Sequence, residues 1–245
     1  RSLSPRMIVL ENVVGTLTSH DGKDFEALVR PLQEEGYDCG GFVADASMFV
    51  PQSRQRLFVV AVSQDLPLPS STYAFGPCNS FHTQGIRRAY SALPKSLRDS
   101  WIWWSLPEPP RETPGLCDIL EPSSEVENWH TEEQTSKLLS MMSEVNVAKI
   151  QDKLRTKERA VGAVYKRMRP HPTGTGRIQR AEVRFDGLSG CLRTPAGGSS
   201  RQILLFVEGK RVRSRLITAR EAARLMGIPE TYRLPENYND AYHLA

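Results

Sequence analysis

The sequence predicts an α/β fold with an open sheet, and three observations support this class. Residues 7–10 and 57–62 are two unbroken apolar runs of strand length. Between them, residues 24–37 repeat apolar side chains at the spacing of one helical face. Apolar strands that alternate with a helix are typical of a sheet covered by helices, so residues 1–64 are predicted to be the last part of such a sheet.

The first strand, residues 7–10, leads directly into Glu11 and Asn12. We expect it to be buried, because its four residues are apolar. The helix after it can be closed by Gly36, since glycine readily adopts the left-handed conformation found after helices. The apolar stripe of this helix consists of Phe25, Leu28, Val29 and Leu32.

Two more strands are predicted at residues 39–45 and 56–62, joined by a loop at residues 46–55. The uninterrupted apolar run of the second predicts that it is covered on both faces. From residue 64 to about residue 118, eight prolines break every period, which predicts a connector or an irregular subdomain. A helical stretch then follows, with its apolar positions at Leu138, Leu139, Met142 and Val145.

The last third contains two glycine-rich loops, residues 171–179 and 193–202, and a hairpin over residues 202–217 that turns at Glu208 and Gly209. A helix is predicted at its end. Its capping box is Thr218 and Glu221, its apolar stripe is Ala222, Ala223 and Met226, and its stop is Gly227 and Pro229.

Charge is unevenly distributed in this chain of 245 residues with net charge +4. Residues 108–144 hold nine acids and two bases, whereas residues 149–215 hold seventeen bases and five acids. The basic stretch favours nucleic acid as a partner, and a solvated helix face is the alternative.

Four widely spaced cysteines without a Cys-x-x-Cys pair indicate neither a disulfide framework nor a metal site. No apolar run has the length of a membrane span, and no signal peptide is recognisable. We therefore expect no membrane contact and a location in the cytoplasm or at the nucleoid.

Polar side chains at predicted strand ends are the candidates for chemistry, because ligands of open α/β sheets bind beyond the carboxyl ends of strands. Glu11 and Asn12 end the first strand, and Gln52, Arg54 and Arg56 lead into the third. An alternative stays open, in which Glu11 caps a helix or pairs with an arginine and the arginine-rich loop is merely solvated.

Three motifs in order resemble those of DNA cytosine-5 methyltransferases: "ENV" after a strand, "QSRQRLFVVAV" some way on, and "REAARLMGIPETYRL" near the end. "GLCDILE" and "GLSGCLRTPAGGSSRQ" resemble parts of the target-recognition region of that family. The resemblance implies the late strands of a Rossmann-like sheet that uses S-adenosylmethionine, and a smaller, irregular, mostly β target-recognition domain.

The same resemblance implies three parts of the chain. Residues 1–64 would be the C-terminal half of the catalytic domain. Residues 65–215 would be a connector with the target-recognition domain, which binds double-stranded DNA. Residues 216–245 would be a helix that links this domain back to the catalytic one.

The family's reaction needs a flipped-out cytosine, a thiolate that adds at carbon 6, and groups that relieve the charge built up on the ring. By resemblance, Glu11 would bind ring N3 and the exocyclic amine, and Arg54 and Arg56 would lie near O2. Asn12, next to Glu11, is predicted to be a catalytic residue as well. Residues predicted to contact the substrate or DNA are Gln52, Arg193, Thr194, Gly197, Gly198, Arg201 and Gln202. A surface loop without function is the alternative for residues 193–202.

Other motifs of the family are missing: a Phe-x-Gly-x-Gly loop for S-adenosylmethionine, a Pro-Cys-Gln loop with the nucleophile, and a closing Gly-Asn motif. Cys78 in "GPCNSFHTQG" superficially resembles the nucleophile, but no apolar strand precedes it. Cys39, Cys117 and Cys191 are predicted to be packing cysteines. The residues that hold the methyl donor therefore stay unassigned.

The simplest interpretation is the C-terminal part of such an enzyme, inactive alone, whose missing half is an absent N-terminal segment or a second polypeptide. Two alternatives stay open: a DNA-binding module or catalytically dead relative, and an unrelated nucleotide-binding α/β protein. The DNA target and any accompanying restriction enzyme cannot be inferred from the sequence.

Overall fold

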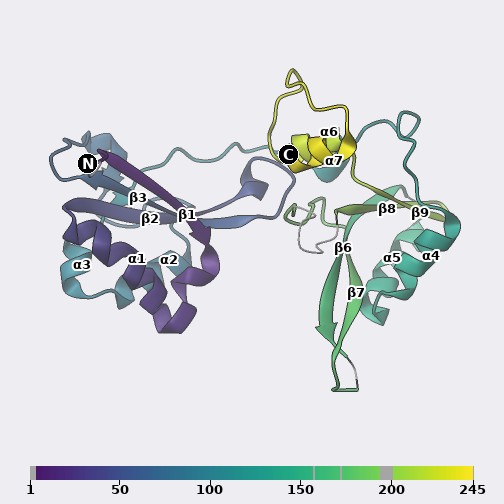
Figure 1. Cartoon of the computed structure of the whole chain (residues 1–245), viewed down its shortest axis with the longest axis horizontal. Coiled ribbons are helices and arrows are strands. Elements are labelled where there is room, and N and C mark those ends of the chain that lie inside the picture. The colour runs from purple at the N-terminus through teal and green to yellow at the C-terminus, as the bar shows by residue number, and fades with distance from the viewer. Residues whose placement is uncertain (1–3, 157, 172, 194–200, 245) are drawn as a thin grey trace. The chain divides into compact units, whose positions relative to one another are not determined.

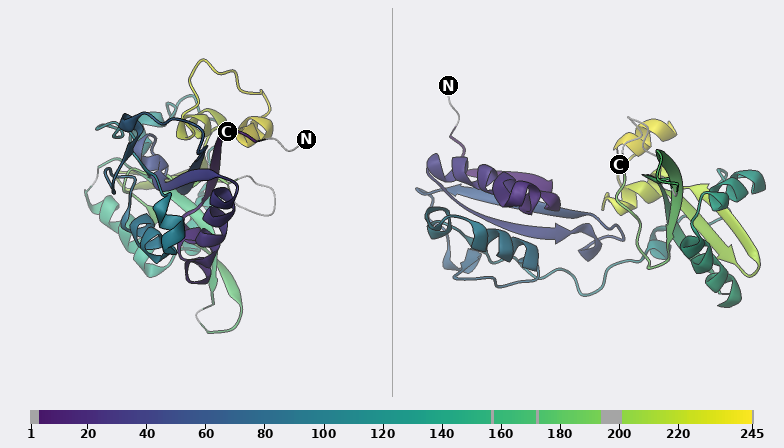
Figure 2. Two further views of the ribbon diagram at one scale, coloured as in Figure 1. Left: turned by 90° about the vertical axis from the view of Figure 1, so that its left-hand side faces the viewer. Right: turned by 90° about the horizontal axis from the view of Figure 1, so that it is seen from below.

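The computed structural model describes residues 4–156, 158–171, 173–193 and 201–244. The chain forms two compact units (Figures 1 and 2). The first consists of Arg1–Asp45 and Gln55–Pro110, and the second consists of Ala46–Arg54 and Arg111–Ala245. Residues 65–110, assigned above to the connector and recognition domain, thus pack within the first unit.

The first unit is built on a three-stranded sheet in the order β1-β3-β2. Its strands are β1 (Met7–Val13), β2 (Tyr37–Asp45) and β3 (Gln55–Ser63), and both outer strands are antiparallel to β3. The helices α1 (Lys23–Glu34), α2 (Gln84–Ala92) and α3 (Lys95–Asp99) share one hydrophobic core with a single face of this sheet. Figure 1 shows all three on the same side of the strands.

This one-sided cover corrects the expectation that the first strand is buried. Exposed and half-buried residues alternate along β1, and Met7, Val9 and Val13 are 54%, 58% and 56% exposed. The physical reason is that β1 is an edge strand whose second face carries no described helix of the first unit. Along β3, Leu57 is fully buried whereas Phe58 is half-buried, so only one face of that strand is fully covered.

Other predicted elements of the first unit are confirmed, and one segment is more regular than expected. Helix α1 buries Phe25 and Val29, and Gly36 after it has φ +82°. Between the prolines, α2 and α3 form two short helices, and a two-stranded ladder pairs β4 (Tyr73–Ala74) with β5 (Trp103–Trp104). Short 3-10 helices occur at Val14–Leu17, Ser19–Gly22, Ala46–Met48, Ser70–Thr72 and Leu116–Ile119.

The second unit contains a four-stranded antiparallel sheet in the order β7-β6-β8-β9. Its strands are β6 (Ala160–Pro170), β7 (Arg177–Arg184), β8 (Ile203–Glu208) and β9 (Arg211–Leu216). One face packs against α4 (Glu132–Ser140) and α5 (Glu144–Thr156), and the other packs against α6 (Ala219–Leu225) and α7 (Tyr238–Leu244). Helices on both faces explain why Ile203–Val207 of β8 is entirely buried.

Two helix predictions in this unit need correction. The single helical stretch around residues 138–145 is two helices, α4 and α5, and Val145 is 69% exposed. In α6 the capping box of Thr218 and Glu221 is confirmed, but the buried residue near its end is Leu225, while Met226 is 42% exposed. The hairpin of β8 and β9 is confirmed with its turn at Gly209.

Candidate active site and nucleic-acid interface

Glu11 and Arg56 meet on the helix-free face of the first sheet. Arg56 lies opposite Val13 in the β1–β3 ladder, so its side chain is on the same face as that of Glu11, two residues earlier. Arg56 Nε donates to Glu11 Oε1 at 3.0 Å, and its Nη1 donates to the Gln55 carbonyl at 2.8 Å. Half of the Glu11 side chain stays exposed. This geometry suits a site that holds a polar planar ligand. It also agrees with the alternative that Glu11 simply forms an ion pair with an arginine.

Asn12 is placed differently from its neighbour. Successive side chains of a strand point to opposite faces, so Asn12 shares the helix-covered face with Leu10 rather than the face of Glu11. Its Oδ1 accepts a hydrogen bond from the Val13 backbone amide at 2.8 Å. The structure therefore gives Asn12 a role in shaping the end of β1.

Gln52 is buried within the second unit, where its side chain connects two segments of the chain. Its side chain is 1% exposed, and its Nε2 donates to the Leu225 carbonyl at 2.9 Å while its Oε1 accepts from the Leu192 amide at 3.3 Å. Backbone hydrogen bonds beside it join Ser53 to Ser189 and Ser189 to Pro51. Gln52 thus ties the segment around residue 192 to the end of α6.

Arg54 and Arg56 belong to different units, although they are only two residues apart in the sequence. Strand β3 begins at Gln55, so Arg54 belongs to the loop that packs with the second unit. There its Nη1 lies 3.0 Å from Cys191 Sγ. Within the first unit, Arg56 is the arginine that pairs with Glu11.

The predicted recognition loop is described only at its two ends. Thr194, Gly197 and Gly198 lie outside the described residues, and Arg193 is exposed. Arg201 stacks on Tyr238 and Tyr242, with its guanidinium carbon 4.9 and 5.7 Å from the two ring centroids, and it donates to Asn239. Gln202 is 5% exposed and donates to the carbonyls of Val164 and Ile203 at 2.8 and 3.0 Å. Arg201 and Gln202 are thus held by protein groups.

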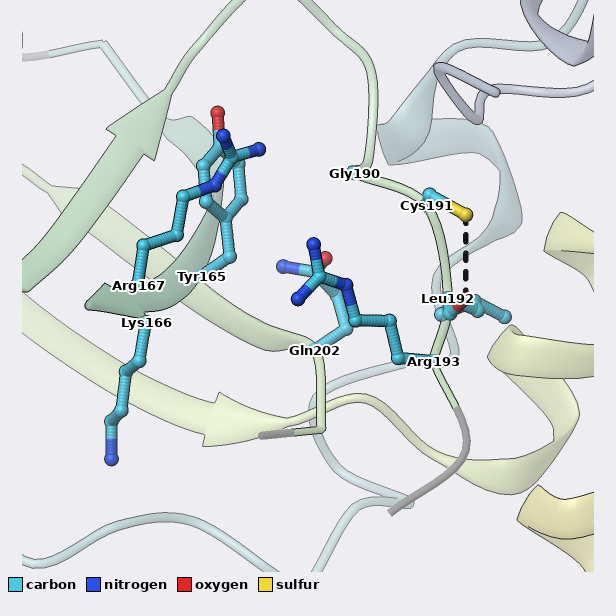
Figure 3. Close-up of a pocket in the computed structure, with 8 residues that line it drawn as sticks. All are labelled: Tyr165, Lys166, Arg167, Gly190, Cys191, Leu192, Arg193 and Gln202. Atoms are coloured by element: carbon cyan, nitrogen blue, oxygen red, sulfur yellow. Dashed lines mark hydrogen bonds between the residues drawn. The ribbon is translucent and has the colours of Figure 1, made fainter. Parts of the chain in front are cut away.

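A cavity of about 60 Å³ lies beside Arg193 and the middle of β6 (Figure 3). Arg167 places its guanidinium carbon 4.6 Å from the centre of the Tyr165 ring, and in Figure 3 both side chains rise on one side while Lys166 points away. The cavity is lined by Tyr165, Lys166, Arg167, Gly190, Cys191, Leu192, Arg193 and Gln202. Sequence reasoning missed Tyr165 and Arg167, although strand alternation in "YKRMR" could have placed them on one face.

The charges next to this cavity are unequally compensated. Arg169 donates to Glu182 at 2.6 Å, and this hydrogen bond lowers the pKa of the Glu182 carboxyl and raises that of Arg169. Arg167 reaches the same carboxylate only at 4.0 Å. The side chains of Arg177 and Arg180 make no hydrogen bond or ion pair with any described residue. Positive charge therefore remains available on β6 and β7.

The four cysteines are not alike. Burial raises the pKa of the Cys39 thiol to about 11, as expected for a packing cysteine, but Cys78 and Cys117 are exposed. His82 Nδ1 accepts the backbone N–H of Cys78 at 3.1 Å and also lies 3.9 Å from the Cys78 Sγ. The packing role expected of Cys117 is therefore wrong.

No helix in the described part of the chain is both long and apolar enough to cross a membrane. Nor do the described residues contain a group of three or more His, Cys, Asp or Glu side chains suited to a metal ion.

Comparison with known proteins gives one family. The family model described as C-5 cytosine-specific DNA methylase matches residues 1–245. The orphan methyltransferase M.SPBetaI of Bacillus phage SPbeta is 26% identical over 224 residues, which are 91% of this chain and 47% of that protein. The type II methyltransferase M.BsuFI of Bacillus subtilis is 32% identical over 105 residues, 40% of this chain and 25% of that protein. The chain thus spans about half the length of the curated relatives that it matches over most of its own length.

A solved structure is also similar. The crystal structure of the Schizosaccharomyces pombe (S. pombe) Dnmt2 methyltransferase superposes with a TM-score of 0.49 at 17% sequence identity, covering 98% of this chain and 62% of that one.

Proposed function

Because the chain belongs to the C-5 cytosine-specific DNA methylase family, we propose that it is part of a DNA cytosine-5 methyltransferase. The complete enzyme would transfer a methyl group from S-adenosylmethionine to carbon 5 of a cytosine flipped out of duplex DNA. In this proposal, the first unit contributes the late strands of a Rossmann-like sheet and the second contributes target recognition. The observation that carries it is the Glu11–Arg56 pair, joined at 3.0 Å on an open sheet face.

The chemistry assigns a task to each member of this pair. Carbon 5 becomes nucleophilic only after a thiolate adds at carbon 6, and charge then builds up on the ring and O2. A carboxyl group hydrogen-bonded to N3 and the exocyclic amine relieves that charge, which is the role proposed for Glu11. Arg56 would donate to O2, the oxygen on the ring carbon next to N3. Because Arg56 also bonds Glu11, it orients the carboxyl group before the base arrives.

The methyl donor does not fit the described residues. Its usual cradle is a glycine turn from a strand into a helix, where backbone N–H groups approach the ligand closely. The glycines with positive φ in the described chain lie elsewhere, at positions 22, 36, 174, 176, 187, 209 and 227. We therefore assign no residue of this chain to S-adenosylmethionine and derive no step through it.

A second polypeptide segment would complete the enzyme on the helix-free face of β1. Met7, Val9 and Val13 form an exposed apolar row on this edge strand, beside Glu11. Such a row on an unprotected edge is typical of a surface that another segment covers. The proposed partner carries the donor loop and the nucleophile. Val9→Asp should abolish association with that partner while leaving the thermal unfolding of this chain unchanged, and association by the variant would contradict the docking face.

Methyl transfer tests the proposed function. Purified alone with duplex DNA and labelled S-adenosylmethionine, this chain should transfer no methyl groups. Combined with a polypeptide that carries both missing loops, it should methylate cytosine at carbon 5. Transfer by the isolated chain would refute the division of the site between two segments.

A non-catalytic DNA-binding module is the second candidate, favoured by the uncompensated arginines of β6 and β7. Salt-dependent binding to duplex DNA, without transfer even after the missing half is supplied, would support this candidate over the enzyme.

A further inference from the structure

An open cavity of about 450 Å³ lies in the first unit, at the edge of β2 that does not pair with β3. Along this edge runs the segment of Trp101 and Ile102, whose backbone bonds to Cys39 of β2. Sites for small molecules typically have volumes of about 300 to 1,000 Å³ and mostly aromatic or apolar walls with a few polar groups. The size of this cavity is therefore that of a small-molecule site.

The cavity is separate from the site of Glu11. Asp38, one of its lining residues, pairs with Val62 of β3 and so stands level with Met7, four residues before Glu11 on β1. Four residues along a strand and two strand spacings across the sheet give roughly 16 Å between the backbones of Asp38 and Glu11. A single base held by Glu11 and Arg56 does not span that distance.

Aromatic side chains form much of the cavity wall. Tyr90 packs on two tryptophans, with its ring centroid 5.6 Å from that of Trp101 and 4.8 Å from that of Trp103, so the three rings hold one another in place. The indole N–H of Trp101 is buried and has no hydrogen-bond partner among the described residues. Phe75 also lines the cavity and is fully exposed. A fixed aromatic wall beside an exposed ring suits a flat ring that stacks between them.

One uncompensated charge lies in the same cavity. The Arg98 side chain makes no hydrogen bond or ion pair with any described residue, and its Nε is buried. Of the two acids in the lining, Asp99 is bound by Lys95 at 2.7 and 2.9 Å, and Asp38 Oδ1 accepts from Gln64 at 3.0 Å. A cationic ligand would be repelled by Arg98, and a purely apolar one would leave its guanidinium unpaired. The cavity therefore favours an anionic group at this end.

We infer that this cavity binds a nucleoside monophosphate, with the base on the aromatic wall and the phosphate on Arg98. A ribose hydroxyl would donate to Asp38 Oδ2, as carboxylates do in other nucleotide sites. A simple aromatic carboxylate would also pair with Arg98, but it would leave Asp38 without a donor and much of the volume to water. The inference goes beyond the proposed function and does not depend on it, because methyl transfer at Glu11 makes no use of this cavity.

Calorimetric titration of the 245-residue chain tests the cavity with three probes. These are AMP, adenosine, which lacks the phosphate, and ribose 5-phosphate, which lacks the base. AMP should bind at one site per chain, at least about tenfold more tightly than either of the other two, because stacking and a charge-assisted phosphate contact both contribute.

Two variants with matched controls assign the two ends of the ligand. Arg98→Gln should weaken AMP about tenfold and leave adenosine unchanged, whereas Arg88→Gln, which removes the same charge from an exposed position of α2 outside the lining, should alter neither. Phe75→Ala should weaken AMP and adenosine alike, by about fivefold or more, with unchanged thermal unfolding because its ring is fully exposed. Phe49→Ala, at an exposed phenylalanine outside the lining, should have no effect.

Four outcomes would overturn the inference. The first is that AMP, GMP and CMP all fail to bind at about 1 mM. The second is that ribose 5-phosphate binds as tightly as AMP, and the third is an equal loss in Arg98→Gln and Arg88→Gln. The fourth is displacement of AMP by S-adenosylhomocysteine, which has no phosphate, or by duplex DNA, because the nucleotide would then occupy the methyl-donor site or the DNA-binding surface. Failure of AMP to bind would leave the proposed function intact, since that function is tested by methyl transfer.

Discussion

Replacing Glu221 by glutamine should destabilise the second unit strongly, because the buried positive charge of Arg215 would lose its negative partner. Arg215 and Glu221 are 1% and 0% exposed and form two hydrogen bonds, 2.6 and 2.7 Å long. Glu221 also accepts the backbone amides of Glu121 and Thr218, both at 2.9 Å. Glutamine has nearly the same shape, but its NH2 group would face two hydrogen-bond donors in either orientation, so the change removes the negative charge and one of the two acceptors. Removing one partner of a buried pair costs about 3–5 kcal/mol.

Urea unfolding of the chain, followed by tryptophan fluorescence, measures this loss, because Trp129 lies 5.5 Å from the Arg215 guanidinium carbon. The matched control is Glu230→Gln, which breaks an exposed pair with Arg224 and should cost less than about 1 kcal/mol. Replacing Arg215 and Glu221 together by methionine should cost less than Glu221→Gln alone, since no charge is left unpaired. Equal losses in the two single variants would refute the reasoning.

Three further predictions concern the first unit. In the completed enzyme, Glu11→Gln should lower the methylation rate at least about a hundredfold with little change in DNA affinity; unchanged turnover would remove Glu11 from the mechanism. The Cys39 thiol should resist alkylation at pH 8, because burial raises the pKa of Cys39 to about 11, while the exposed Cys78 reacts. The free energy of unfolding should fall as pH rises from about 8.5 toward 11, because the Cys39 thiol then ionises in the unfolded chain before it ionises in the folded one. Gly40→Ala should destabilise the unit by more than about 2 kcal/mol in urea unfolding, since its Cβ would lie 1.8 Å from the Ile102 carbonyl oxygen, whereas Gly76→Ala, with open space around it, should not.

The mixed α/β class follows from local patterns that need no tertiary information. The stripe of α1 and the capping box of Thr218 and Glu221 are set by residues within a few positions of one another, so sequence alone was sufficient there. Helices α2 and α3 were not predicted, because each is short and bounded by proline or threonine. They are stabilised by the packing of Ile86 and Leu97 on the sheet, which local sequence patterns do not show.

The exposure of one face of β1 could not be predicted, for a different reason. Apolar residues such as Val9 show that a strand face needs cover, but they do not show which chain supplies it. In the described structure the helices cover only the face of Leu10, so the row beside Glu11 stays open. The resemblance placed Arg54 and Arg56 together near O2. The boundary between the two units falls between them, because β3 begins at Gln55, and this boundary could not be predicted from the sequence.

The sequence and the structure assign different roles to Gln52. The sequence assigns it to DNA or substrate contact, whereas the structure buries it between the Leu225 carbonyl and the Leu192 amide. Gln52→Ala leaves both groups without this partner and opens a cavity, so the free energy of unfolding should fall by about 2–4 kcal/mol. DNA affinity of the folded variant should then fall only through displacement of the segment around Leu192, and the slope of affinity against salt should not change, because no phosphate contact is lost. A variant of unaltered stability that binds DNA weakly would instead show that Gln52 contacts DNA directly.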